Sequence, residues 1–424
     1  MTTKFSADKK RLITNFFSLS SVEVANYIFP LITLPYLVRV LGPDRFGLIA
    51  FAQAFTQYFV LITDYGFNLS ATRNVSIHRE DTNKVSAIFS AVMLIKACLM
   101  IFSFAIFSAF IFSIPKFRAD WLLYYCAFGL VVGNVMFPIW LFQGMERMKL
   151  IALLNFLAKL IFLAAIFIFV RKQGDYILVP LITAAGAVTA GIISLIFARK
   201  YFGIRLVPVS AKEISHEMKE GWHIFISTAA ISLYTTSNTF ILGLLTNNTI
   251  VGYYNAAERI VRSGQRLFNP ISQTIYPHIN RLVADSKDRA VVFIKKALLM
   301  IGGGSFIVSA AIFILAGPIV RIILGPQFAQ SVIVLRILAF LPFVIALSNI
   351  FGIQTMLTFD LKKQFSKIII AAGLINIPTA ILLVTLYQHV GLSIAVLATE
   401  SFVTVSMFYY LHTRGILKTG RTHA

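Results

Sequence analysis

Three arginines in one apolar stretch are the most informative charged residues of this chain. Arg259, Arg262 and Arg266 lie three and four residues apart, so a helix would place them on one face. A guanidinium group stays charged at accessible pH and binds phosphate oxygens through a planar fork of donors. The spacing therefore predicts a site for an anion that carries several phosphate charges.

Two other interpretations of this cluster stay open. Glu258 directly precedes Arg259, and this acid could hold the arginines in a structural network. Arg259 lies nearest the expected outer end of its helix, where a long side chain can reach the lipid headgroups. Arg262 and Arg266 lie deeper in the apolar stretch, which favours a cavity for these two side chains.

Single cations in other apolar stretches extend the prediction. They are Lys96, Lys159 and Arg336, the last at the beginning of its stretch. A charge at the centre of a bilayer costs roughly 3 kcal/mol or more, so it should face a cavity or a partner. We therefore expect these residues and the arginines to line one cationic lumen, with a lipid pyrophosphate headgroup as its natural ligand. The flexible stem of Lys96 also allows it to reach the membrane surface.

Acids in apolar sequence are fewer, and they are the candidates for coupling to an ion. Glu23, Glu400, Asp64 and Glu258 could each exchange a proton or a sodium ion. Each could equally form a salt bridge with a cation of the lumen. Asp64 stands at the inner end of its stretch, in the sequence TDYGFN, where a cap of the helix end is the favoured interpretation.

No enzyme signature accompanies these charges. The sequence lacks a phosphate-binding glycine loop, a histidine-rich metal spacing and a nucleophile with its base on a loop. The two cysteines, Cys98 and Cys126, lie inside apolar stretches and are interpreted as small hydrophobic residues. We therefore expect neither an enzyme nor a cofactor or metal site.

Membrane-spanning helices must position these residues. Hydrophobic residues make up 58% of the 424 residues, charged residues 13%, and the mean hydropathy is +0.81. Soluble domains contain about 25% charged residues, and a helix needs about 20 apolar residues to cross a bilayer. The predicted fold class is an all-α integral membrane protein, because the alternating short strands of a membrane barrel are absent from the sequence. The twelve apolar blocks lie near residues 16–41, 46–70, 85–112, 121–145, 150–171, 176–202, 222–246, 250–280, 292–316, 330–358, 364–388 and 391–412.

The basic residues between the blocks orient the chain. Most of them lie in the N-terminal segment and in the connections after each second block. Positive charge collects on the cytoplasmic side of membrane proteins, which predicts that both termini are cytoplasmic. The net charge of +21 is dispersed in this way rather than gathered on one face, so no nucleic-acid partner is expected.

Two lobes of six helices each are predicted, at residues 1–210 and 211–424. A short sequence match relates them, because Gly47 and Gly252 occupy corresponding places 205 residues apart, as do Ala52 and Ala257. Both halves would begin on the same side of the membrane. They would therefore be parallel repeats about an axis along the membrane normal, an arrangement that serves alternating access.

Seven segments resemble bacterial polysaccharide flippases of the O-antigen (Wzx) type, which belong to the multidrug/oligosaccharidyl-lipid/polysaccharide exporter superfamily. Examples are DYGFNLSATRN at 64–74 and VGYYNAAERIVR at 251–262. The other segments are 25–47, 137–149, 221–234, 269–279 and 347–357. This resemblance covers nearly the whole chain. It implies a MATE-like, V-shaped bundle of two six-helix lobes in the bacterial inner membrane.

The resemblance also implies an activity, the movement of undecaprenyl-pyrophosphate-linked oligosaccharide units from the cytoplasmic to the periplasmic leaflet. Alternating access would expose the cationic lumen to each side, with a proton or another cation as a potential coupling ion. The pyrophosphate would be held by Arg262 and Arg266, with help from Arg259, Lys159, Arg336 and Lys96. Membrane lipids, an O-antigen polymerase and a chain-length regulator are the partners that follow.

Three alternatives stay open. A multidrug or cation exporter of the same superfamily would need an acidic or apolar lumen, whereas the predicted lumen is basic. A membrane enzyme of glycan assembly would need a large external loop or a catalytic set of histidine and aspartate, and neither is visible in the sequence. A scaffold for polysaccharide assembly is compatible with the sequence as an additional role.

Overall fold

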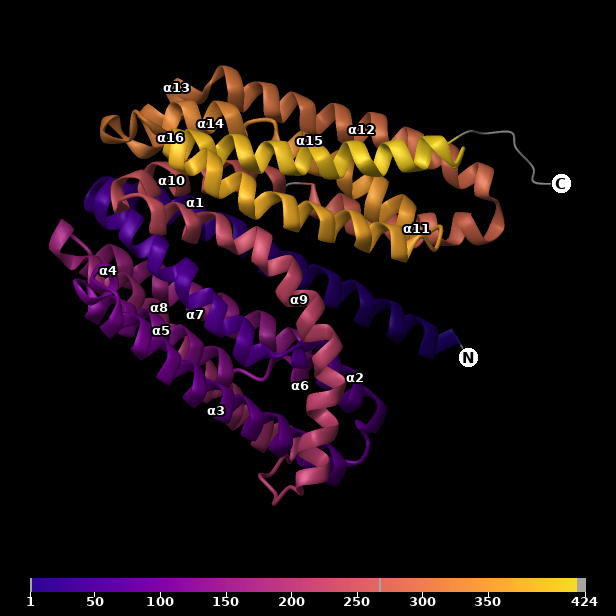
Figure 1. The fold of residues 1–424 in the computed structure, drawn as a ribbon. Helices are drawn as coiled ribbons and strands as arrows, with labels where there is room; N and C mark the ends of the chain where they lie inside the picture. The colour runs from indigo at the N-terminus through magenta and orange to yellow at the C-terminus, as the bar shows by residue number, and fades with distance from the viewer. Residues whose placement is uncertain (1, 267, 418–424) are drawn as a thin grey trace. The chain divides into compact units, whose positions relative to one another are not determined.

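The computed structural model describes residues 2–266 and 268–417, and every regular element in these ranges is a helix (Figure 1). The chain divides into two compact units. Unit 1 comprises Met1–Leu41 and Phe51–Ala229, and unit 2 comprises Gly42–Ala50 and Ala230–Ala424. Residues 42–50 thus pack with the second half of the chain, and residues 211–229 pack with the first.

Unit 1 contains the helices from α1 to the first part of α9. They are α1 (Thr2–Asp64), whose residues 42–50 belong to unit 2, α2 (Phe67–His78), α3 (Thr82–Ser113), α4 (Pro115–Arg118), α5 (Trp121–Met136), α6 (Ile139–Gly144), α7 (Met148–Phe169), the 3₁₀ helix η1 (Gln173–Ile177), α8 (Leu178–Phe202) and α9 (Ala211–Leu245), which continues into unit 2.

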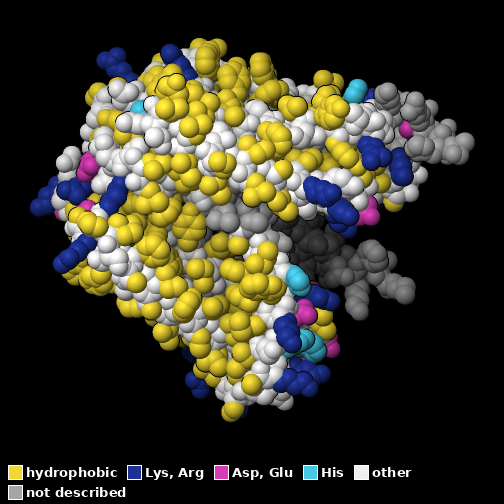
Figure 2. Space-filling model, viewed as in Figure 1, with side chains coloured by type: hydrophobic (Ala, Val, Ile, Leu, Met, Phe, Trp, Pro, Cys, Tyr) yellow, Lys and Arg dark blue, Asp and Glu magenta, His cyan; other side chains and the backbone are white. Residues whose placement is uncertain are grey.

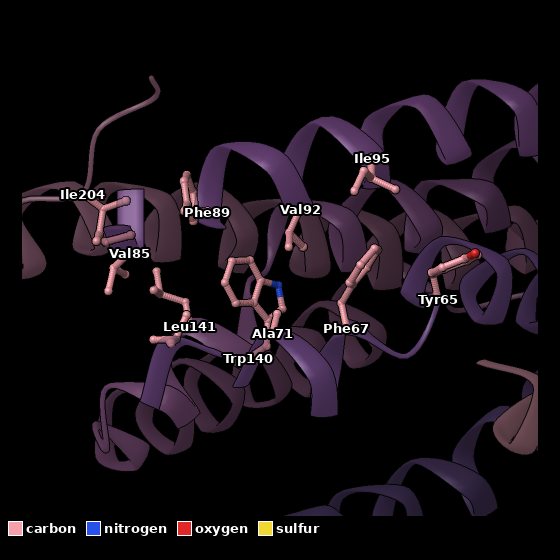
Figure 3. Close-up of a cluster of buried hydrophobic side chains, with 12 residues drawn as sticks. Tyr65, Phe67, Ala71, Val85, Phe89, Val92, Ile95, Trp140, Leu141 and Ile204 are labelled. Carbon is pink, nitrogen blue, oxygen red and sulfur yellow. The ribbon is translucent and has the colours of Figure 1, made fainter. Parts of the chain in front are cut away.

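A buried aromatic side chain organises part of the unit 1 core. Trp140 of α6 is fully buried, next to Phe67 of α2 and Phe89 and Val92 of α3 (Figure 3). The ring of Trp140 lies 6.0 Å from that of Phe89. Burial of such large apolar surfaces stabilises the packing of α6 against α2 and α3, which precede it in the sequence.

Unit 2 contains the remaining helices. They are the rest of α9, α10 (Asn248–Arg266), α11 (Asn269–Asp285), α12 (Lys287–Ile314), α13 (Ala316–Ile319), the π-helix η2 (Val320–Leu324), the 3₁₀ helix η3 (Pro326–Phe328), α14 (Ser331–Leu338), α15 (Leu341–Asn349), the π-helix η4 (Ile350–Leu357) and α16 (Lys362–Thr413).

Two long helices each join two of the predicted apolar blocks. Gly42, with a φ of 70°, interrupts α1 between the first and second blocks. Gln388, with a φ of 50°, interrupts α16 between the last two blocks. Glycine adopts such a φ without steric cost, whereas glutamine rarely does. Both kinks coincide with the points where the sequence pattern ends one block and begins the next.

The membrane class of the chain is evident from its helices and its surface. Seven helical spans among the described residues are long and apolar enough to cross a membrane. Large apolar side chains are exposed over both units (Figure 2), among them Leu299, Ile314 and Leu374, each more than 70% exposed. Exposed apolar surface of this extent is typical of contact with lipid. The predicted all-α membrane fold is confirmed, while the count of twelve crossings stays a prediction.

A tight crossing within unit 2 joins residues 42–50 to α10. A Cβ atom added to Gly47 would collide with the carbonyl oxygen of Asn248, and one added to Gly252 would collide with that of Pro43. These contacts are reciprocal, because Asn248 and Gly252 follow Pro43 and Gly47 by the same 205 residues. An isologous contact of this kind is what a two-fold axis produces. This symmetry is shown for the two segments 43–47 and 248–252 within unit 2, and the wider relation between two six-helix halves stays a prediction.

Candidate functional site

The amphipathic helix α10 positions the arginine cluster in unit 2. Val251, Tyr254 and Ala257 are fully buried on one of its faces. Arg259 is half-buried on another face, and the side chains of Arg262 and Arg266 are exposed. Glu258 is also buried, so the apolar face of the amphipathic helix α10 includes one charged residue.

Arg262 is held by a buried acid one helical turn before it. Its Nη2 lies 2.7 Å and its Nε 3.0 Å from Oε1 of Glu258. Glu258 is only 7% exposed, whereas the side chain of Arg262 is 45% exposed. The network that the sequence left open as an alternative is therefore present for this arginine. It fixes the guanidinium plane, and Nη1 makes no hydrogen bond to any described residue.

Arg259 is packed rather than extended. Its Nε donates to Oδ1 of Asn255 at 2.9 Å, and its guanidinium carbon lies 5.2 Å from the ring centre of Phe46. A cation over an aromatic face is stabilised by the ring's negative potential. Arg259 thus links α10 to residues 42–50 within unit 2, and this contact takes the place of a reach toward lipid headgroups.

A small polar cavity in unit 2 brings Arg262 together with Glu400. Its volume is about 50 Å³. Asn376 is buried there and donates from Nδ2 to Oγ1 of Thr399 at 3.0 Å, while its Oδ1 accepts no hydrogen bond from a described residue. A space of this size suits water or one small cation and excludes a sugar. The lining residues are Asn238, Arg262, Gln265, Leu341, Ile345, Asn376, Val396, Thr399 and Glu400.

Two of these residues do not stand out in the sequence. Asn376 and Thr399 are uncharged polar residues of the apolar blocks 364–388 and 391–412. Asn and Thr residues are common in membrane helices, where they hydrogen-bond to a neighbouring helix. The signal was therefore present but unspecific: Thr399 directly precedes Glu400 in the sequence, and only the fold shows that Asn376 lines the same cavity.

The remaining unit 2 candidates lie elsewhere. Arg266 ends α10, and Arg336 is an exposed residue of α14. Neither residue lines the small cavity. The structure thus brings Arg262, Glu258 and Glu400 together, and it places these two arginines outside that group.

The candidates of unit 1 include a buried ion pair. Nζ of Lys96 lies 3.1 Å from Oδ1 of Asp64, and Lys96 is only 1% exposed. Asn68 donates from Nδ2 to the other carboxylate oxygen at 3.3 Å. Asp64 is the last residue of α1, and its carboxylate neutralises Lys96 of α3. Lys159 of α7 is half-buried, and the side chain of Glu23 lies outside the part of α1 whose side chains are described.

We expect Lys96→Met to destabilise unit 1, because it leaves Asp64 without its cation in a partly buried site. Loss of one partner of a buried pair costs about 3–5 kcal/mol, and the partial exposure of Asp64 favours the lower end. The double variant Lys96→Met with Asp64→Asn should recover most of the stability. Thermal unfolding of the purified protein in detergent measures both effects. Equal unfolding temperatures for wild type and Lys96→Met would contradict a structural role for the pair.

Sequence comparison finds similar proteins over nearly the whole chain. Residues 12–283 match the polysaccharide biosynthesis protein family. A protein of Escherichia coli (strain K12), named "Putative O-antigen transporter", is 38% identical over 97% of this chain and 99% of its own length. A protein of Shigella dysenteriae with the same name is 29% identical over 93% of this chain and 98% of its own length.

Structure comparison finds the same architecture in solved transporters. The lipid II flippase MurJ, in an inward closed conformation, superposes with a TM-score of 0.71 over 96% of this chain and 90% of its own, at 11% identity. An inward-facing MATE multidrug resistance transporter of the MOP superfamily gives a TM-score of 0.67 over 93% of this chain and 96% of its own, at 14% identity. At such low identities the likeness concerns the fold alone, and it agrees with the predicted MATE-like bundle.

Proposed function

The chain belongs to the polysaccharide biosynthesis protein family, and we therefore propose that it flips undecaprenyl-pyrophosphate-linked O-antigen units across the membrane. It is a multi-pass membrane transporter rather than an enzyme. The observation that carries the proposal is the 38% identity, over nearly the full length of both chains, to a protein named as an O-antigen transporter. The fold likeness to a lipid II flippase supports it.

The proposed pyrophosphate contact is the guanidinium of Arg262. Glu258 uses Nε and Nη2 of this group, which leaves Nη1 as a donor for a phosphate oxygen. Glu258 contacts only one edge of the guanidinium. It therefore orients Arg262 and leaves the other edge open to a phosphate oxygen. Arg266 would add a second cation one turn further along α10. Arg336, exposed on α14, and Lys159, half-buried on α7, are proposed as further basic residues, whereas Arg259 and Lys96 are engaged by Phe46 and Asp64.

Glu400 is the proposed coupling group. It shares the small cavity with Arg262, Asn376 and Thr399, so a proton or a small cation bound there would change the charge next to the arginine. Binding of the ion would neutralise the Glu400 carboxylate, and its release would restore that charge beside Arg262. The positive charge that Arg262 offers to a phosphate would therefore depend on whether the cavity holds an ion, which links the substrate to an ion gradient. Glu258, in contrast, orients Arg262, and Asp64 balances Lys96.

We expect Glu400→Gln to separate binding from coupling. The amide keeps the size of the side chain and can still accept a hydrogen bond, but it carries no exchangeable charge. Transport driven by a proton or sodium gradient should fall at least about tenfold, while exchange of substrate without a gradient should persist. Proteoliposomes with and without an imposed gradient measure the two rates. Unchanged gradient dependence in the variant would exclude Glu400 as the coupling group.

The proposal includes location and partners. The chain would lie in the inner membrane with both termini in the cytoplasm, and it would deliver units to an O-antigen polymerase and its chain-length regulator. Fusion of a reporter enzyme to the C-terminus tests the topology. Activity of a cytoplasmic reporter supports this orientation, and activity of a reporter that works only in the periplasm contradicts it.

Complementation tests the function itself. A host that lacks its own flippase but makes the matching lipid-linked unit should recover surface polysaccharide when this chain is expressed. The alternative within the superfamily, a multidrug or cation exporter, predicts no recovery and a raised resistance to cationic dyes instead. The two outcomes are measured in the same strain.

A further inference from the structure

A row of basic side chains follows one face of α9 at the end where this helix begins. Lys212, His216, Lys219 and His223 are spaced four, three and four residues apart, which places them within about 60° of one another around the helix. All four are exposed. We call this set the basic stripe. In Figure 2, blue and cyan side chains follow the end of α9 where the helix begins.

The acidic side chains of the same segment of α9 have hydrogen-bond or ion-pair partners within unit 1. Glu217 is 4% exposed. Each of its two carboxylate oxygens lies 3.2 Å from Nδ2 of Asn74, which donates to them. Glu220 lies 3.7 Å from Nη1 of Arg73. Glu213 accepts from the backbone N–H of Ser210. Glu217 and Glu220 are thus held by side chains of α2, while Glu213 is exposed and caps the beginning of α9.

An apolar groove of about 710 Å³ runs along the basic stripe within unit 1. Lys219 and His223 belong to both features, and the exposed Trp222 forms part of the wall. The other lining residues are Tyr65, Ala211, Ile214, Ser215 and Met218. A groove with a cationic rim and an apolar wall matches a molecule with an anionic head and a hydrocarbon chain.

The groove is built by a close contact between α9 and the end of α1. A Cβ atom added to Gly221 would lie 2.8 Å from the carbonyl oxygen of Tyr65, so only glycine allows this approach. The ring of Tyr65 stacks on Phe225 at 5.0 Å and lies 6.3 Å from Trp222. These aromatic rings form a rigid wall at the point where α9 becomes apolar. Tryptophan is enriched at that depth of a membrane, where the ring meets the headgroups.

From these features we propose that the groove and the basic stripe bind an anionic glycerophospholipid. The phosphate would lie against Lys219 and His223, with Lys212 and His216 adding attraction along the membrane surface. One acyl chain would lie along Trp222 and Met218. The lysines of the rim are hydrated point charges rather than planar forks, which favours an abundant bilayer lipid over a tightly held substrate. The proposed ligand is a component of the bilayer and is distinct from the transported unit.

Fluorescence quenching by brominated lipids tests this site in the full-length protein. The sequence has three tryptophans, and Trp121→Phe leaves Trp222 as the exposed one, because Trp140 is fully buried. Vesicles of phosphatidylcholine would contain a small fraction of either brominated phosphatidylglycerol or brominated phosphatidylcholine. We expect phosphatidylglycerol to quench Trp222 more strongly at equal fractions, and this preference should weaken as salt is added.

Charge variants identify the headgroup contact. Lys212→Gln with Lys219→Gln should reduce the preference for phosphatidylglycerol about tenfold. Lys295→Gln with Lys296→Gln is the matched control, because it removes the same charge from exposed positions of α12 and should leave the preference unchanged. Lys212→Arg with Lys219→Arg should restore it, which separates lost charge from misfolding.

Three results would overturn the proposal. One is equal quenching by the two brominated lipids in the Trp121→Phe protein. Another is a preference that survives the Lys212→Gln and Lys219→Gln changes. The third is displacement of brominated phosphatidylglycerol by a small amount of polyprenyl diphosphate, which would assign the groove to the lipid carrier of the substrate instead.

Discussion

Replacement of Arg262 and Arg266 by alanine should reduce transport of the lipid-linked unit at least about 100-fold. Each arginine supplies charge-assisted hydrogen bonds worth about 1.5–3 kcal/mol, and two such losses give a factor of this size or more. Surface polysaccharide in a complemented host measures the effect. Lys295→Ala with Lys296→Ala removes two exposed cations of α12 and should leave transport unchanged.

A second set of variants separates binding from folding. Arg262→Ala leaves Glu258 buried without its partner, which could lower the amount of folded protein. Adding Glu258→Gln removes that stranded charge, so the triple variant should accumulate normally and still fail to transport. Arg262→Lys keeps the charge but loses the planar fork and should retain only part of the activity. Normal surface polysaccharide in the well-expressed triple variant would place the anion site elsewhere.

Replacement of Gly252 by alanine should severely disturb the fold of unit 2. The added Cβ would collide with the backbone carbonyl of Pro43, and a backbone atom cannot rotate away as a side chain can. Forced overpacking lowers the free energy of unfolding by about 1–3 kcal/mol when the surroundings can shift. A collision with a backbone atom should lower it further. The unfolding temperature of the purified protein should fall, and surface polysaccharide in the complemented host should fall with it.

The chain offers a matched control for this prediction. A Cβ atom added to Gly303 of α12 would meet no neighbouring atom within 4 Å, so Gly303→Ala should be neutral or stabilise the helix by up to about 1 kcal/mol. Gly47→Ala should resemble Gly252→Ala, because the contact is reciprocal. If Gly252→Ala unfolds at the wild-type temperature, the crossing is looser than the structure indicates.

The membrane fold could be predicted from the sequence because lipid imposes a simple rule. Each block of about 20 apolar residues must be a helix, and the helices of the structure follow these blocks even where α1 and α16 join two of them. The relation between Gly47 and Gly252 was also visible as a spacing. The contact of each glycine with the segment of the other was not visible in the sequence, because a spacing contains no information on packing.

The site was predictable only in part. The arginines of α10 and the acid Glu400 stand out in the sequence because charge is rare in apolar blocks. Their partners do not, since Asn376 and Thr399 belong to residue types that any membrane helix uses. The pairing of Lys96 with Asp64 joins residues of different helices, and only the fold shows that these opposite charges neutralise each other.

Movement of the lipid-linked unit between leaflets can be followed by a protection assay in proteoliposomes. The vesicles would hold the purified chain, a labelled undecaprenyl-pyrophosphate-linked unit and an imposed ion gradient, with an impermeant reagent added outside. We predict that wild type makes the inner-leaflet units accessible to the reagent and that the variant lacking Arg262 and Arg266 matches vesicles without protein. Equal accessibility with and without the wild-type chain, under both proton and sodium gradients, would show that the chain does not flip this lipid.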